Sequence, residues 1–392
     1  MKHLLAAAPL LSTLCSAQTW TQLEDLPGIA RDDAAAFSIG TDVFVGTGMD
    51  VGYQLTSDWY AFNTISGTWT SIAPLPASGR QYCTAFTING HGYVFGGTDG
   101  APLNELWSYD PIADQWSQRA SLPSVGRAGC VSFVLGDKAY IATGKVAPDF
   151  EPTTEMWVYD PSADVWTQGP SLPLPARALS SSFVIGDTAY VHGGQNADGM
   201  VLSAFEAYTI GSNTWTSLPA TASSLFGSDA FGLADRGVIV CGAGTTDPPY
   251  EVSTEVYLQP SGSWMWTPPV FIGTGRKGGC GAVVNGTIYY GTGISGIDRQ
   301  KDWYKLEWPV GVPIHATSNA PFLVSNLVDD LLVLRTSTEL GPVVAEIHDQ
   351  LGRLCSSATT KEIDVHALAN GRYTLLLTHG TDRHALPFVV QH

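Results

Sequence analysis

The chain has 392 residues, of which 44% are apolar and 14% are charged, a composition that excludes an intrinsically disordered protein and permits a large core. Its formal net charge is -17. Because an acidic surface repels phosphate backbones, we expect no nucleic-acid partner.

The first 17 residues have the pattern of a signal peptide. Lys2 and His3 form a polar start, residues 4–14 are apolar, and small residues lead up to Ala17. The apolar stretch is too short to span a bilayer, and no other segment is long and apolar enough to do so. The alternative is a buried helix at the start of a domain. We expect cleavage after Ala17 and a secreted or cell-surface protein.

A tryptophan recurs at intervals of 47 to 51 residues through the region 18–309. The six positions are Trp20, Trp69, Trp116, Trp166, Trp215 and Trp266. A fixed period of this length indicates a repeat architecture, in which each unit buries its faces only against its neighbours.

Each repeat predicts four short strands and no helix. In the second repeat these strands cover 80–88, 92–97, 106–111 and 114–117, with Asn89-Gly90 as a tight turn. A pair of small residues ends every second strand: Thr47-Gly48, Gly96-Gly97, Thr143-Gly144, Gly193-Gly194, Ala243-Gly244 and Thr292-Gly293. Four-stranded units repeated around an axis make a β-propeller, and we expect each strand-four tryptophan to cover its blade against the next one.

The two ends of this region complement each other. The sixth repeat stops after its third strand, at 302–306, whereas the chain begins with a lone fourth strand at 18–21. We therefore expect an all-β, six-bladed propeller over 18–309, closed by the N-terminal strand, which leaves no open sheet edge.

The paired small residues, the aromatic third strand and the strand-four tryptophan resemble the kelch family across all six repeats. The resemblance implies the propeller fold. It implies no single function, because kelch propellers include binding modules, sugar-modifying enzymes and copper oxidases.

The period breaks after the sixth repeat. Residues 310–318 read as a linker, and 319–392 as a small β-sandwich. Its expected strands are 330–335, 343–348, 362–365, 371–377 and 386–391. Segments 347–353, 368–373 and 388–391 resemble the C-terminal sorting domain of the bacterial type IX secretion system. The resemblance implies secretion machinery as a partner, and the alternative is an ordinary accessory sandwich.

The loops between the second and third strands are long and differ in every repeat, whereas the turns between the first and second strands are minimal. These long loops carry Tyr53, Phe150 and Tyr250, and variable loops on a rigid scaffold are where recognition usually occurs. We therefore predict that one face of the propeller binds a ligand through these three aromatic residues.

An arginine precedes the first strand in five repeats and enters on the same face: Arg31, Arg80, Arg127, Arg177 and Arg276, with Phe226 in the fifth repeat. We predict that these arginines surround the mouth of the axial channel, where guanidinium groups suit a carboxylate or sulfate. The alternative is structural, with each arginine bonded to neighbouring carbonyls or to loop carboxylates such as Asp99 and Glu151.

Catalysis has little support in the sequence. The propeller region contains two histidines, His91 in a turn and His192 in a strand, too few for a copper site, and we expect no cofactor or metal. Adjacent carboxylates such as Asp32 and Asp33 point to opposite sides of a strand and make a poor acid–base couple.

The leading hypothesis is a monomeric, non-catalytic binding module for a glycan or a protein. The alternative is a metal-independent sugar epimerase or mutarotase of the sialate-epimerase kind. The sequence therefore does not decide whether the protein is an enzyme, although it favours a non-catalytic role. An Asp or Glu at the channel mouth, within reach of a bound sugar, would favour the enzyme.

Overall fold

The computed structural model describes residues 20–307 except 222, 246–249, 260 and 265–268, together with segments of the C-terminal region. Those segments are 322–323, 327–328, 331–335, 344–349, 353–358, 362–369, 371–379 and 382–390. The predicted signal peptide, the linker and Trp266 lie outside the described residues. The chain divides into two compact units, Met1–Trp308 and Pro309–His392.

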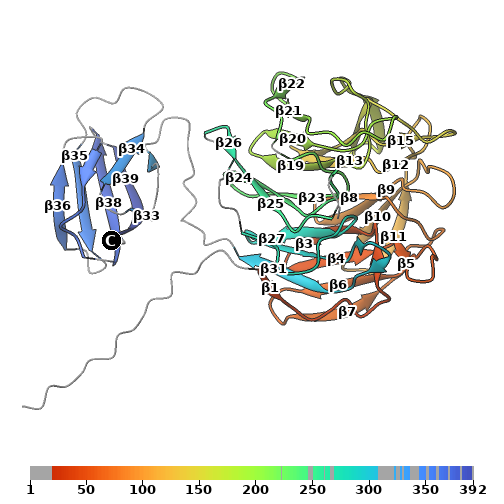
Figure 1. The fold of residues 1–392 in the computed structure, drawn as a ribbon, viewed down its shortest axis with the longest axis horizontal. Helices are drawn as coiled ribbons and strands as arrows, with labels where there is room; N and C mark the ends of the chain where they lie inside the picture. The colour runs from red at the N-terminus through yellow and green to blue at the C-terminus, as the bar shows by residue number, and fades with distance from the viewer. Residues whose placement is uncertain are drawn as a thin grey trace, which may run out of the picture. The chain divides into compact units, whose positions relative to one another are not determined.

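The first unit contains six four-stranded antiparallel sheets, numbered here in chain order (Figure 1). Sheet 1 has β3 (Ala35–Ile39), β4 (Asp42–Gly46), β6 (Trp59–Asn63) and β7 (Thr68–Ile72). Sheet 2 has β8 (Thr84–Ile88), β9 (His91–Phe95), β10 (Leu106–Asp110) and β11 (Gln115–Arg119). Sheet 3 has β13 (Val131–Leu135), β14 (Lys138–Ala142), β17 (Met156–Asp160) and β18 (Val165–Gln168).

The remaining sheets follow the same order. Sheet 4 has β19 (Ser181–Ile185), β20 (Thr188–His192), β21 (Phe205–Thr209) and β22 (Thr214–Leu218). Sheet 5 has β23 (Asp229–Gly232), β24 (Arg236–Val240), β25 (Thr254–Leu258) and β26 (Ser263–Trp264). Sheet 6 has β27 (Cys280–Val284), β28 (Thr287–Gly291), β31 (Trp303–Glu307) and β1 (Trp20–Gln22).

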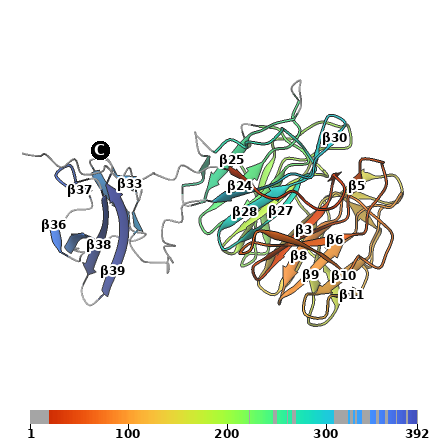
Figure 2. The same ribbon diagram turned by 90° about the horizontal axis from the view of Figure 1, so that it is seen from below.

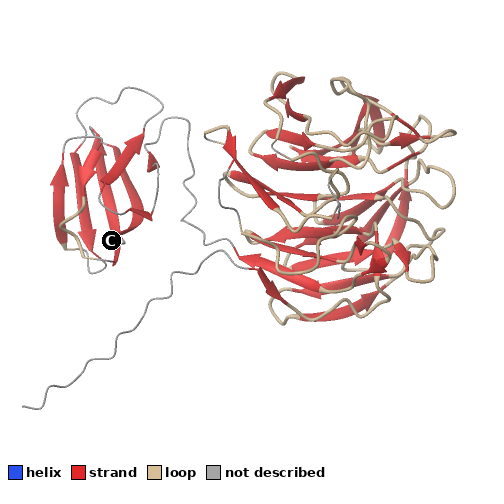
Figure 3. Ribbon diagram, in the orientation of Figure 1, coloured by secondary structure: helices blue, strands red, loops and turns tan. Residues whose placement is uncertain are grey.

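The segments between these strands contain further two-residue strands: β2 (Arg31–Asp32), β5 (Met49–Asp50), β12 (Arg127–Ala128), β15 (Lys145–Val146), β16 (Glu151–Pro152), β29 (Ile294–Ser295) and β30 (Asp298–Arg299). All described regular structure is strand (Figure 3). Among these described residues there is accordingly no helix long and apolar enough to cross a membrane.

The first strands of the six sheets lie side by side. β3 contacts β8, β8 contacts β13, and the series continues through β19, β23 and β27, which contacts β3 again. Figure 2 shows part of this series, with β27, β3 and β8 next to one another. Their residues alternate between buried and part-exposed, as in β8, where Thr84, Phe86 and Ile88 are buried. This alternation is the period of a strand with one face packed in the core.

The N-terminal strand supplies the outer edge of sheet 6. β1 pairs antiparallel with β31, with Trp20 opposite Leu306. The Trp20 ring is buried and meets Phe271 edge-on at a centroid distance of 5.1 Å. The first and last segments of the unit therefore share one sheet.

The strand-four tryptophans join adjacent sheets, but in the direction opposite to the one predicted. The Trp116 indole N–H donates to the Ala73 carbonyl at 2.9 Å, and its ring lies 5.1 Å from that of Trp59 in the preceding sheet. Trp166 likewise donates to Ala120 at 2.8 Å. Trp69 and Trp215 reach back in the same way, to the carbonyls of Glu24 and Pro170, which lie in the segments that leave the preceding fourth strands.

The second unit consists of two sheets. One contains β32 (Phe322–Leu323), β34 (Leu331–Arg335) and β37 (Glu362–Asp364). The other contains β33 (Leu327–Val328), β39 (Asp382–Val390), β38 (Gly371–His379), β35 (Val344–Asp349) and β36 (Leu354–Ala358). The five expected strands correspond to β34, β35, β37, β38 and β39, whereas β32, β33 and β36 were missed. The buried cluster includes Ile347, Ile363 and Leu375.

Candidate functional site

The five repeat arginines are buried rather than open to a channel mouth. Each has at most 1% of its surface exposed. The pairs are Arg31–Asp58, Arg80–Glu105, Arg127–Glu155, Arg177–Glu206 and Arg276–Asp302. The partners lie in or just before the third strand of the same repeat, and are not Asp99 and Glu151. This geometry matches the structural alternative and argues against ligand contact, because a buried guanidinium must be paired.

Arg31 shows how fully such a group is held. Its Nη1 and Nη2 donate to both Asp58 oxygens at 2.7 and 2.8 Å, and Nη1 also donates to the Thr47 carbonyl at 3.1 Å. Burial would raise the pKa of the Asp58 carboxyl, but the hydrogen bonds from Arg31 outweigh it and lower that pKa. The pair therefore stays ionised and ties the entry of β2 to the third strand.

The fifth repeat departs from this pattern at Leu225, not at Phe226. The Gly194 N–H donates to the Leu225 carbonyl, as the Gly144 N–H does to that of Arg177, so Leu225 occupies the arginine position. The small pair that ends the second strand is likewise Cys241-Gly242, two residues before the predicted Ala243-Gly244, because the Gly242 N–H makes the equivalent bond to Arg276.

Two residues after each of these positions, the backbone forms a closed ring that we call the axial ring. Its members are Asp33, Tyr82, Gly129, Leu179, Gly227 and Gly278. Each N–H donates to the carbonyl of the ring member in the preceding sheet, at 2.7 to 3.2 Å, and the Asp33 N–H closes the circle on Gly278. All six have positive φ, between 53° and 62°. The ring provides a rigid floor on the axis.

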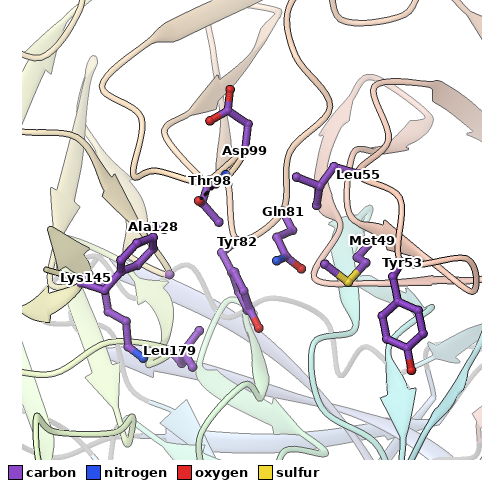
Figure 4. A pocket seen from close by; sticks show the side chains of 13 residues that line it. Met49, Tyr53, Leu55, Gln81, Tyr82, Thr98, Asp99, Ala128, Lys145 and Leu179 are labelled. Atoms are coloured by element: carbon purple, nitrogen blue, oxygen red, sulfur yellow. Dashed lines mark hydrogen bonds between the residues drawn. The ribbon is translucent and has the colours of Figure 1, made fainter. Parts of the chain in front are cut away.

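A cavity of about 450 Å³ opens above one side of this floor. Loops of four sheets line it: Met49, Tyr53, Leu55, Gln81, Tyr82, Thr98, Asp99, Gly100, Ala128, Gly129, Lys145, Phe150 and Leu179. Figure 4 shows Tyr82 in the middle, with Lys145 and Leu179 on one side and Gln81 and Met49 on the other. We call it the mouth cavity. It combines aromatic, aliphatic, amide, hydroxyl and charged groups in one concave site.

Two of the three predicted aromatic residues reach the mouth cavity. Tyr53 and Phe150 line it and are exposed, with positive φ of 59° at both. The Arg299 guanidinium lies 4.6 Å from the centre of the Tyr53 ring and also pairs with Asp32 at 2.5 Å, which holds the ring in place. Tyr250 is part-exposed in the loop of sheet 5 and does not line the cavity.

Asp33 is the functional candidate that the sequence pattern did not reveal. Its carboxyl is only partly accessible and accepts a hydrogen bond from Tyr82. Burial and the neighbouring Asp32 carboxylate raise its pKa to about 8, although Lys277 and Tyr82 act in the opposite sense. The expectation that Asp32 and Asp33 point to opposite sides is wrong, because their carboxyl groups are close enough to share a side-chain hydrogen bond. The sequence signal that could have identified Asp33 is its position, two residues after the repeat arginine Arg31.

Neither His91 nor His192 lines the mouth cavity. His192 is fully buried, bonds the Thr221 hydroxyl at 2.9 Å, and has its pKa lowered to about 4 by burial. His91 lies at the start of β9. Within the described ranges, no group of three or more His, Cys, Asp or Glu side chains is arranged to hold a metal ion.

Comparisons with known proteins agree with this architecture. The sequence matches the KLHDC2/KLHL20/DRC7 Kelch-repeats domain over residues 10–194 and the Kelch motif over residues 176–220. Residues 10–220 therefore carry kelch repeats, and these matches, together with the six four-stranded sheets, support a kelch β-propeller for the first unit.

One similar solved structure is that titled "Structure of YjhT". It has 19% sequence identity and a TM-score of 0.63, with 72% of this chain and 95% of that chain covered. At this identity the likeness concerns the fold alone. No curated protein matches the sequence.

Proposed function

We propose that the chain is a ligand-binding propeller whose binding site is the mouth cavity together with the surrounding loops, and that its ligand is a glycan or a protein segment. The six sheets act as six blades closed by β1. The observation that carries the proposal is the cavity itself, about 450 Å³ and lined by loops of four sheets. This volume falls in the usual range for small-molecule sites.

The chemistry of the lining supports recognition. Aromatic faces at Tyr53, Tyr82 and Phe150 suit the apolar face of a sugar ring or an apolar side chain. Lys145, Gln81 and Asp99 supply donors and acceptors around them. The axial ring below is fixed by six backbone hydrogen bonds, so little ordering is required on binding.

A glycan and peptide array tests the proposal. The full chain is compared with Tyr53→Ala/Phe150→Ala, and with Ile65→Ala/Ile112→Ala as a matched control, because Ile65 and Ile112 are exposed in turns on the opposite face. We expect specific signals that fall at least tenfold in the first double variant and persist in the control. Absence of any specific signal, or equal signals from both variants, would contradict the proposal.

One observation favours the second candidate function, a metal-independent sugar epimerase or mutarotase. Asp33 is not itself in the lining of the mouth cavity, but its carboxyl, whose pKa is raised, accepts a hydrogen bond from Tyr82, which is a lining residue. In mutarotation an acid protonates the ring oxygen while a base removes the anomeric hydroxyl proton, the ring C–O bond breaks, and the carbonyl carbon is attacked again from either side. Asp33 is suited to the acid role because a group acts best when its pKa lies near the working pH.

The enzyme candidate is tested by NMR exchange between the anomers of any sugar that the array identifies. Wild type should accelerate exchange and Asp33→Asn should lose at least 90% of the acceleration, while binding persists. If the wild-type protein binds the sugar but the anomers still exchange at the uncatalysed rate, the enzyme candidate fails and the binding function stands.

We also propose that the chain is exported and acts outside the cell. The signal-peptide pattern of residues 1–17 and the likeness of residues 319–392 to a secretion sorting domain support this. Removing 319–392 should leave a folded propeller that stays in the periplasm of the native host, measured by fractionation and immunoblotting. Normal appearance of the truncated chain in the medium would contradict the sorting role.

A further inference from the structure

The loops between the second and third strands form an unusual surface around the mouth cavity, which we call the rim. The described residues of these loops are 47–58, 96–105, 143–155, 193–204, 241–245, 250–253 and 292–302. Five of the six expose a large apolar side chain: Val51 and Tyr53 in sheet 1, and then Phe150, Met200, Val252 and Ile297. Exposed apolar groups gathered on one face mark an interaction site.

A carboxylate accompanies the apolar residue in each of these five loops. Phe150 lies between Asp149 and Glu151, Ile297 precedes Asp298, and Met200 follows Asp198 by two residues. Among the described rim residues, five carboxylates are exposed, namely Asp99, Asp149, Glu151, Asp198 and Asp298, against one exposed lysine, Lys301. The rim is therefore acidic as well as apolar.

The basic groups nearest the cavity are already engaged or partly covered. Arg299 pairs with Asp32, and the Lys277 ammonium lies 4.9 Å from the centre of the Phe226 ring. Lys145 is half-buried in the wall of the cavity. The outer rim thus presents mainly negative charge to an approaching molecule.

From this pattern we propose that the rim binds a basic segment of another protein, in which Lys or Arg side chains alternate with apolar ones. The proposal rests on the proposed binding function and narrows its ligand. Complementary charge steers and selects partners, and apolar contacts supply the affinity. Three of the rim side chains, Met200, Val252 and Ile297, are aliphatic and lack the flat faces that stack on sugar rings. An acidic glycan would meet like charge at the same loops.

The test is selection from a phage-displayed library of random twelve-residue peptides by the full-length protein. We expect the selected peptides to be enriched several-fold in Lys and Arg relative to the library. A synthetic selected peptide should bind about tenfold more weakly to Asp198→Asn/Asp298→Asn at low salt. The matched control, Asp137→Asn/Asp187→Asn, neutralises two exposed carboxylates in turns of the opposite face and should bind like wild type.

Two results would overturn the proposal: selected peptides without basic enrichment, or equal binding to the rim variant and wild type. If the array gives a glycan signal that depends on Tyr53 and Phe150 while no basic peptide is selected, this inference fails and the proposed function stands. If neither assay gives a ligand, both fail.

Discussion

Replacing Arg31 by alanine tests whether the repeat arginines hold the fold or hold a ligand. The side chain has no exposed surface, and its donors reach the Ile29 and Thr47 carbonyls, the Thr56 hydroxyl and both Asp58 oxygens. Removing one member of a buried ion pair costs roughly 3–5 kcal/mol. Because 39% of the Asp58 side chain is exposed and water can reach it, we expect the lower end, about 3 kcal/mol.

The assay is urea unfolding followed by tryptophan fluorescence. All 12 tryptophans lie at or before Trp308, so the signal reports on the propeller unit alone. A loss of about 3 kcal/mol corresponds to a decrease in melting temperature of about 6–12 °C for a large domain. Lys138→Ala removes an exposed pair with Asp160 and should leave the transition unchanged. A loss below about 1 kcal/mol in Arg31→Ala, together with weaker ligand binding, would refute the structural role.

Three further predictions follow from the same contacts. Deleting residues 18–24 exposes the edge of β31, so the melting temperature should fall by several degrees or the protein should aggregate; an unchanged melt would contradict closure by β1. Because Arg31 lowers the pKa of Asp58, that pair stabilises the fold fully above the ordinary Asp pKa of about 3.9 and less as the pH falls through the lowered value, so acid should destabilise wild type more than Arg31→Ala. Asp33, whose pKa is raised to about 8, binds a proton more tightly when folded, so its contribution to stability falls as the pH rises from about 4 to about 8; Asp33→Asn should raise the melting temperature at pH 9 more than at pH 5, and an equal change at both would contradict the raised pKa.

The repeat made the fold predictable. A period near 50 residues located all six sheets, and the lone N-terminal strand indicated the pairing of β1 with β31. Details that depend on the exact alignment of the repeats were harder to predict. Composition aligned Ala243-Gly244 and Phe226 with the other repeats, whereas the backbone hydrogen bonds assign Cys241-Gly242 and Leu225 to those positions. Sequence spacing alone does not reveal a shift of one or two residues when the side chains are similar.

For the candidate site, the sequence could predict only which face of the propeller carries it. Long, variable loops directed attention to Tyr53 and Phe150, which line the mouth cavity, and to Tyr250, which does not. The arginines appeared as a charged ring because their partners are scattered, 25 to 29 residues downstream. Asp33 was missed because its environment comes from Tyr82 and Lys277 of other repeats, which only the closed axial ring brings together.

Hydrogen–deuterium exchange of the full chain, with and without the tightest ligand from the array, tests the central claim most directly. If the mouth cavity is the binding site, the ligand should slow exchange in segments 49–55, 81–82, 98–100 and 145–150, and leave the opposite turns at 40–41, 89–90 and 136–137 unchanged. Protection confined to those opposite turns, or to residues 319–392, would contradict it.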